Sequence, residues 1–143
     1  MSLRKLAVVA VLFVAFASLY FVLNRHERAF VSLLQNEIEE GRARVDLAVV
    51  FDGDWELMCF SHPYDGPLKL DKYGISYPPV ADAQDGAWGF LFIKADGSYR
   101  SVSGSRSDGF EFDPDLVCIE QKDAKFQFAP DRKRWSLDTV QDS

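Results

Sequence analysis

The chain has 143 residues, of which 48% are hydrophobic and 14% aromatic, and a formal net charge of −6. This hydrophobic content can form a packed core and excludes a globally disordered chain. Residues 1–44 carry six Lys or Arg and four Glu, a net charge of +2, whereas residues 45–143 carry ten Lys or Arg and 18 Asp or Glu, a net charge of −8. Because an acidic domain repels phosphates, we expect no nucleic-acid partner.

The first predicted element is an apolar run of 18 residues, Leu6 to Leu23, which contains no charged side chain. A helix of about 20 apolar residues crosses the roughly 30 Å hydrocarbon core of a membrane. The sequence therefore predicts a transmembrane helix over residues 6–23, after a short cytoplasmic segment at residues 1–5. Because Arg4 and Lys5 precede the run, we expect a single-pass protein of the inner membrane with its C-terminal domain on the periplasmic side.

A cleaved signal peptide is the alternative to this anchor. Ala15, Phe16 and Ala17 form an A-x-A triplet, and cleavage after Ala17 would release a secreted protein. The apolar run continues to Leu23, whereas a cleavage region is normally more polar. We therefore favour the uncleaved anchor.

Residues 24–44 predict a juxtamembrane amphipathic helix without proline. Apolar side chains recur along one stripe at helical spacing: Ala29, Phe30, Leu33, Leu34 and Ile38. Gly41 is a suitable residue to end the helix, so one helix can run from about Lys5 to Glu40. We expect the stripe to pack on the following domain; a second copy of the chain is the alternative.

Residues 45–138 predict a β-rich domain, followed by a tail at residues 139–143. Alternating apolar residues and turn signals predict these strands: Val45–Phe51, Trp55–Phe60, Ala87–Lys94, Tyr99–Ser103, Phe110–Phe112, Leu116–Gln121, Lys125–Phe128 and Arg134–Leu137. Residues 61–86, rich in proline and glycine, predict a long loop, and residues 104–109 a flexible connector. We expect residues 116–121 to pair with residues 125–128. The fold class is therefore α+β, with an antiparallel meander as a curled sheet or a sandwich.

The chain has two cysteines, Cys59 and Cys118, on an early and a late predicted strand. Their number and spacing do not fit a zinc site. We expect them to form a disulfide, as in an exported domain. We expect neither a metal nor a cofactor.

The stretch from Ser61 to Asp65 is the most site-like part of the sequence, with a hydroxyl, an imidazole, a phenol and a carboxylate. A hydrolase that uses His62 and a nearby carboxylate is one hypothesis. Against it, Ser61 and His62 are adjacent on an extended chain and point to opposite faces. We therefore expect no catalytic residue here, and a loop start is the simpler interpretation.

A protein-binding surface is the favoured hypothesis. Tyr73, Tyr77 and Trp88 are aromatic residues of the type that anchors interfaces. Three acids lie on predicted strands: Glu56, Glu111 and Glu120. If the acids form one face, they attract a basic protein of the cell envelope, with the aromatic residues at the centre. The alternative is that the tyrosines cover the open side of the sheet.

The pattern Trp-x3-Cys-Phe-x2-Pro-Tyr, from Trp55 to Tyr64, resembles small, membrane-anchored bacterial envelope proteins. The resemblance covers about ten residues. It implies a non-enzymatic protein-binding role, such as an immunity factor, an inhibitor or an assembly accessory. It carries no residue roles over to this chain.

Overall fold

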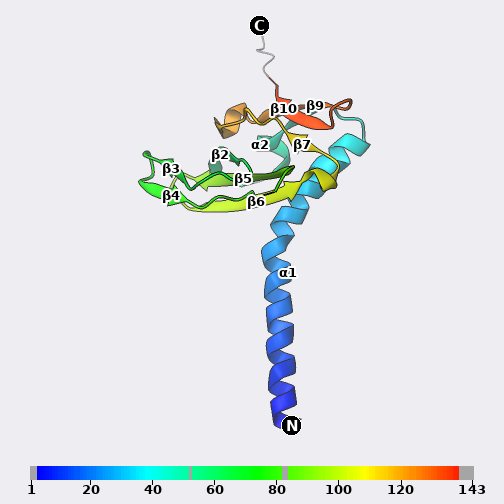
Figure 1. The fold of residues 1–143 in the computed structure, drawn as a ribbon, viewed down its shortest axis with the longest axis vertical. Coiled ribbons are helices and arrows are strands. Elements are labelled where there is room, and N and C mark those ends of the chain that lie inside the picture. The colour runs from blue at the N-terminus through cyan, green and yellow to red at the C-terminus, as the bar shows by residue number, and fades with distance from the viewer. Residues whose placement is uncertain (1–2, 52, 82–83, 139–143) are drawn as a thin grey trace.

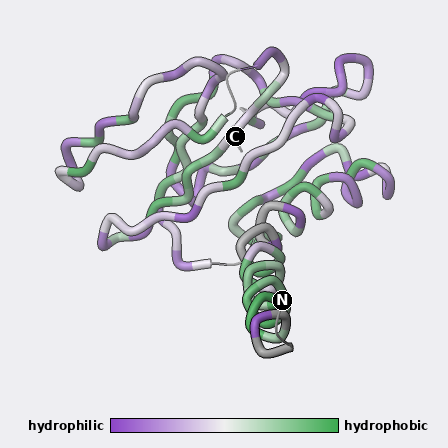
Figure 2. The backbone as a smooth tube through the Cα atoms, turned by 60° about the horizontal axis from the view of Figure 1, so that its bottom comes forward, coloured by the Kyte–Doolittle hydropathy of each residue, from purple (hydrophilic) through white to green (hydrophobic). Residues whose placement is uncertain are grey.

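The computed structural model describes residues 3–51, 53–81 and 84–138, and its longest element is the helix α1 (Leu3–Glu39). The first part of α1 projects from the domain as a stalk, and its last part lies beside the sheets (Figure 1). In this part the side chains of residues 7–22 are all exposed, with Phe13 and Phe16 both at 76%. Figure 2 shows this part of the tube as mostly green, the colour of hydrophobic residues.

Among the residues that the structure describes, no helix is both long and apolar enough to cross a membrane. The predicted span runs from Leu6 to Leu23, and the side chains of these two end residues lie outside the described part of the chain. Residues 1–2 of the predicted cytoplasmic segment and the predicted tail at residues 139–143 also lie outside it.

The last part of α1 packs against the domain through four of the five residues of the predicted stripe; the fifth, Ala29, is exposed. Phe30 and Leu34 are fully buried, and Leu33 and Ile38 pack at the edge of the same core. Two backbone hydrogen bonds close the helix, from Gly41 N to Ile38 O at 3.0 Å and from Arg42 N to Glu37 O at 2.9 Å. Gly41 has a φ of +71°, which glycine adopts without strain. Packing on the chain's own domain and the helix end near Gly41 are both confirmed.

Two four-stranded sheets and a separate hairpin make up the β domain. The first sheet has the strand order β1-β9-β10-β7, the second β6-β5-β2-β8, and β3 pairs with β4 (Figure 1). The strands are β1 (Arg44–Asp46), β2 (Trp55–Ser61), β3 (Leu68–Leu70), β4 (Ile75–Tyr77), β5 (Ala87–Lys94), β6 (Tyr99–Ser105), β7 (Glu111–Phe112), β8 (Cys118–Glu120), β9 (Lys125–Ala129) and β10 (Arg134–Leu137). The α+β class with mostly antiparallel pairing is confirmed.

Strand β5 is buried on both faces and separates two hydrophobic clusters. Trp88, Phe90 and Phe92 point into the main core, which they share with Phe30 of α1. Leu91 and Ile93 point to the opposite face, which the β3–β4 hairpin covers. This double burial explains why its sequence, AWGFLFIK, is almost continuously apolar.

The predicted disulfide joins Cys59 of β2 to Cys118 of β8, whose Cα atoms are 4.0 Å apart. The two residues are direct partners across the antiparallel pair. The bond therefore fixes the register of an edge strand of the second sheet, on the face turned toward the hairpin.

The strand predicted over residues 45–51 is wrong beyond Asp46. The chain there forms the short helix α2 (Leu47–Val50), which Asp46 caps by accepting a hydrogen bond from Ala48 N at 3.0 Å. Leu47 N donates instead to Ala124 O at 2.9 Å. An aspartate at the helix start thus overrides the alternating pattern.

The loop predicted over residues 61–86 contains the β3–β4 hairpin. Leu68 and Leu70 alternate around Lys69, and Leu68 pairs with Tyr77. Gly74 N donates to Asp71 O at 3.2 Å in the connecting turn. The correction is local, because each strand has only three residues.

Two predicted features of strand pairing are wrong. Residues 116–121 do not pair with residues 125–128, because β8 joins β2 in one sheet and β9 lies between β1 and β10 in the other. The short 3-10 helix η2 (Gln121–Asp123) carries the chain between the sheets. In addition, β7 and β10 pair in parallel, so the domain is not a pure antiparallel meander.

Candidate functional site

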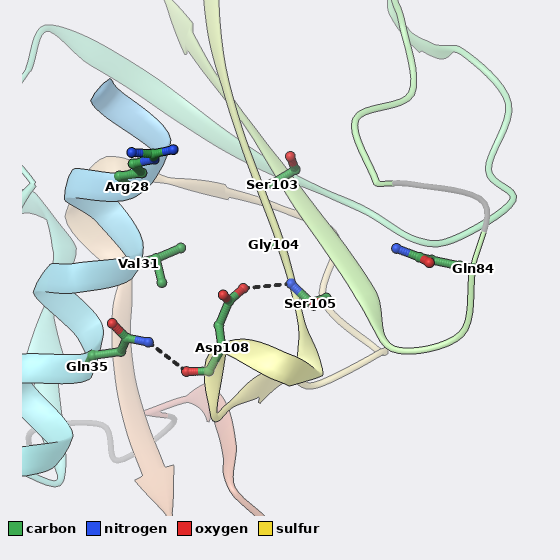
Figure 3. Close-up of a pocket in the computed structure, with 8 residues that line it drawn as sticks. All are labelled: Arg28, Val31, Gln35, Gln84, Ser103, Gly104, Ser105 and Asp108. Atoms are coloured by element: carbon green, nitrogen blue, oxygen red, sulfur yellow. Dashed lines mark hydrogen bonds between the residues drawn. The ribbon is translucent and has the colours of Figure 1, made fainter. Parts of the chain in front are cut away.

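A polar pocket of about 460 Å³ lies where α1 faces the end of β6 and the 3-10 helix η1 (Arg106–Asp108) (Figure 3). Arg28, Val31 and Gln35 of α1 form one wall of this α1–η1 pocket. Their spacing of three and four residues places them on the same side of the helix. Small-molecule sites occupy about 300–1,000 Å³, so the pocket can hold a small polar ligand.

The opposite wall is formed by the backbone at the end of β6. A Cβ atom at Gly104 would lie 2.7 Å from the Asp108 Oδ2 atom and would overlap the Trp88 indole. Only glycine fits such a close approach. The Trp88 ring therefore lies against Gly104, on the same side of β6 as the Asp108 carboxylate.

Three hydrogen bonds hold η1 in place, and two of them involve Asp108. Ser105 N donates to Asp108 Oδ2 at 2.8 Å, and Ser107 N donates to Ser105 Oγ at 3.3 Å, which together cap the short helix. Gln35 Nε2 donates to Asp108 O at 2.8 Å and so joins α1 to η1. The second carboxylate oxygen of Asp108 is turned toward α1 in Figure 3.

The pocket thus combines opposite charges with neutral hydrogen-bonding groups. Arg28 is exposed on α1, and Asp108 is half-buried on η1. Ser103 and Gln84 also line the space. Such a set of side chains can bind a small ligand that has a negative end, a positive end, and hydroxyl or amide groups. Sequence reasoning missed this site because it took residues 104–109 for a flexible connector.

A second hollow, of about 200 Å³, brings together His62, Trp88 and Glu111. Glu111 accepts hydrogen bonds from Arg134 Nη2 at 2.6 Å and from Arg106 Nε at 3.1 Å. The Arg134 hydrogen bond in particular lowers the pKa of Glu111. Glu111 is therefore a charged, paired residue of this hollow rather than an open acidic contact.

His62 has the nearby carboxylate that the hydrolase hypothesis requires. Its Nδ1 atom lies 3.1 Å from Asp65 Oδ2, and its Nε2 atom contacts Pro114 O. Ser61 is buried, and its Oγ accepts from Val80 N at 3.0 Å. Because both ring nitrogens of His62 have partners and Ser61 points elsewhere, this arrangement holds two loops together and does not favour hydrolysis.

The predicted aromatic anchors do not form an exposed group. Tyr77 is fully buried and donates its hydroxyl to Gly97 O at 2.9 Å. Trp88 is 1% exposed, in the main core. Tyr73 is half-buried and donates its hydroxyl to Glu56; burial raises its pKa. The alternative, that the tyrosines cover the sheet, describes the structure.

The three predicted acids lie in both sheets and carry partners. Glu56 and Glu120 lie on the neighbouring strands β2 and β8, whereas Glu111 belongs to β7 of the other sheet. Lys72 lies 2.5 Å from Glu56, and Lys122 lies 2.8 Å from Glu120. Hydrogen bonds from these lysines lower the pKa of both glutamates. The negative charge is therefore divided and partly neutralised.

In comparisons with protein-family models, with curated proteins and with solved structures, nothing matches this chain. Within the described ranges, no group of three or more His, Cys, Asp or Glu side chains could hold a metal ion. The function must therefore be inferred from the pockets, the exposed side chains and the long helix.

Proposed function

We propose that the protein is a membrane-anchored, non-enzymatic binding protein. The first part of α1 inserts into the membrane. The disulfide-linked domain binds a protein partner on the outer surface of that same membrane. The apolar run in residues 6–23 supports the anchor, since its 18 residues are close to the length of a spanning helix.

One observation carries this proposal: every side chain of residues 7–22 in the stalk is exposed. Val11 is 68% exposed, Phe13 76% and Phe16 76%. The four successive residues Val11, Leu12, Phe13 and Val14 are all exposed and point to different sides of the helix, because successive residues are about 100° apart. Each large apolar side chain left in water costs roughly 1.5–3 kcal/mol, so a stalk with such residues on every side needs an apolar environment. A bilayer provides it around the whole helix.

Flotation with liposomes tests the anchor. The full chain should rise with the lipid in a density gradient and remain bound after alkaline carbonate washing. Val14→Arg together with Ala17→Arg should abolish retention, because charged groups are costly within hydrocarbon. The matched control, Arg132→Ala with Lys133→Ala, changes two exposed residues of the domain and should float normally. Release of the unchanged protein by carbonate would contradict the anchor.

The partner that we propose is a basic protein of the cell envelope, as the net charge of −8 over residues 45–143 favours. Tyr64, at 68% exposure, is the most open aromatic side chain described in the domain. A photo-crosslinker at position 64 should therefore trap a protein, with a yield that falls as salt rises. A crosslinker at Val49, which is 76% exposed on α2, is the control. Absence of a salt-sensitive adduct at position 64 would contradict this partner.

A further inference from the structure

The α1–η1 pocket lies where the stalk meets the domain. Arg28 is five residues beyond Leu23, which corresponds to about 7.5 Å along a helix. The polar headgroup region extends roughly 5–7 Å beyond the hydrocarbon on each side of a bilayer. If residues 6–23 span the membrane, as the proposed function requires, the Arg28 backbone lies at the outer edge of the headgroup region, which its long side chain can reach.

The two charges of the pocket are at opposite ends. Gln35 contacts the backbone of Asp108 at 2.8 Å, whereas Arg28 is seven residues, or about 10.5 Å, closer to the membrane along α1. In Figure 3 the Arg28 and Asp108 side chains lie on different sides of the open space. Among the ion pairs of the described residues, none joins Arg28 to Asp108.

We infer that this pocket binds a phosphoethanolamine group, a phosphate ester that also carries an ammonium. The Arg28 guanidinium binds the phosphate, because its planar N–H donors match phosphate oxygens. The second Asp108 oxygen accepts a hydrogen bond from the ammonium. A ligand with only one kind of charge would meet a like charge at one end of the pocket.

The same chemical group has two sources. It is the headgroup of phosphatidylethanolamine, and it also occurs in soluble phosphate esters of ethanolamine. The depth of Arg28 favours the lipid, provided that the proposed anchor holds. An experiment must therefore measure ligand binding to the pocket both with and without lipid.

The Trp88 indole provides the readout, because it lies against Gly104 of the pocket wall, on the same side as the Asp108 carboxylate. The full chain, labelled with ¹⁵N, is placed in nonionic detergent and titrated with glycerophosphoethanolamine. The indole N–H signal of Trp88 should shift and saturate, whereas the signal of Trp135, on β10 of the other sheet, should stay unchanged. Glycerophosphocholine, whose trimethylated nitrogen has no N–H donor, and inorganic phosphate should shift it much less.

Variants of the two charged residues test whether each residue binds one end of the ligand. Arg28→Gln and Asp108→Asn should each weaken the apparent affinity about tenfold, as expected for the loss of one charged hydrogen bond. Arg25→Gln is the matched control, because Arg25 is an exposed arginine of the same helix that does not line the pocket. Its affinity should equal that of the unchanged chain. Normal far-ultraviolet circular dichroism must accompany each result.

Nanodiscs distinguish the two sources. In discs of phosphatidylcholine with phosphatidylethanolamine, the Trp88 signal should already be at its bound position, and in discs of phosphatidylcholine alone it should be at its free position. A shift only with the soluble ester would assign the site to a soluble ligand. No shift with either source, or an equal shift with phosphate alone, would overturn the inference. Failure of the chain to float with liposomes would contradict the anchor and leave the detergent titration interpretable.

Discussion

The two parts of α1 differ in what their phenylalanines contact. Phe16, in the stalk, is 76% exposed, whereas Phe30, beside the sheets, is fully buried. Phe30 lies 5.1 Å from the Phe51 ring and 5.7 Å from the Phe92 ring, measured between centroids. In the stalk apolar residues occur on every side of the helix, but beyond Arg28 polar residues separate them into one stripe. One continuous helix therefore has two environments, which its sequence pattern distinguishes.

The largest effect is expected when Phe30 is truncated. Phe30→Ala should lower the free energy of unfolding of the domain by about 3–5 kcal/mol, because it removes a fully buried aromatic ring. Phe16→Ala should change it by less than about 0.5 kcal/mol. Urea unfolding of the full chain in detergent, followed by tryptophan fluorescence, measures both. Equal losses for the two variants would contradict the division of α1.

Loss of the disulfide should affect the domain and leave the stalk unchanged. Cys59 and Cys118 are separated by 59 positions, so replacing both with Ala should cost about 2–4 kcal/mol of unfolding free energy. The bond lies on the face of β2 opposite to the Phe30 cluster. Flotation with liposomes should therefore be normal while urea unfolding shifts. A variant that lost its lipid binding would show that stalk and domain are coupled.

A smaller effect is expected for the hydrogen bond between α1 and η1. Gln35→Ala should lower the free energy of unfolding by about 1 kcal/mol, because it removes the donor to Asp108 O. Asn36→Ala is the matched control, since Asn36 is the next residue of the same helix and is exposed. Its effect should be near zero in the same urea experiment. No difference between these neighbours would mean that this bond contributes nothing to docking of α1.

The smallest effect concerns pH. The Arg134 hydrogen bond lowers the folded-state pKa of Glu111, so its stabilising contribution is fully present above the unfolded value of about 4.3. It is lost as the pH falls through the folded pKa. The unchanged domain should therefore be more stable than Glu111→Gln at pH 7, and the difference should shrink below about pH 4. Urea titrations across this range measure it; parallel curves would contradict the pairing.

Much of the fold could be predicted where the buried residues gave the sequence a clear apolar pattern. The almost continuous apolar run AWGFLFIK predicted β5, and the apolar stripe with Phe30 predicted the packed part of α1. Sheet membership could not be predicted, because it depends on which surfaces meet across the core. The β-bulge between Trp55 and Leu57 is an example: it places Trp55 in the main core and Leu57 with the hairpin cluster, although alternation assigns them to one face.

The candidate site was harder to predict from the sequence than the fold. Arg28 and Asp108 are 80 positions apart, and only the docking of α1 beside η1 brings them to one pocket. The helical spacing of Arg28 and Gln35 was visible, but nothing in the sequence indicated which strand would face them. The tyrosines misled for a related reason, since an aromatic residue beside proline can cover a sheet or contact a partner.

Paramagnetic quenching tests the anchor most directly. The full chain is placed in phosphatidylcholine nanodiscs, and a water-soluble gadolinium chelate is added while backbone amide signals are followed by NMR. We expect the amides of residues 8–22 to keep their intensity, whereas the amide signals of the exposed turn residues Ala95 and Asp96 are lost. A lipid-attached spin label should give the opposite pattern. Strong quenching of residues 8–22 by the soluble chelate would contradict the account.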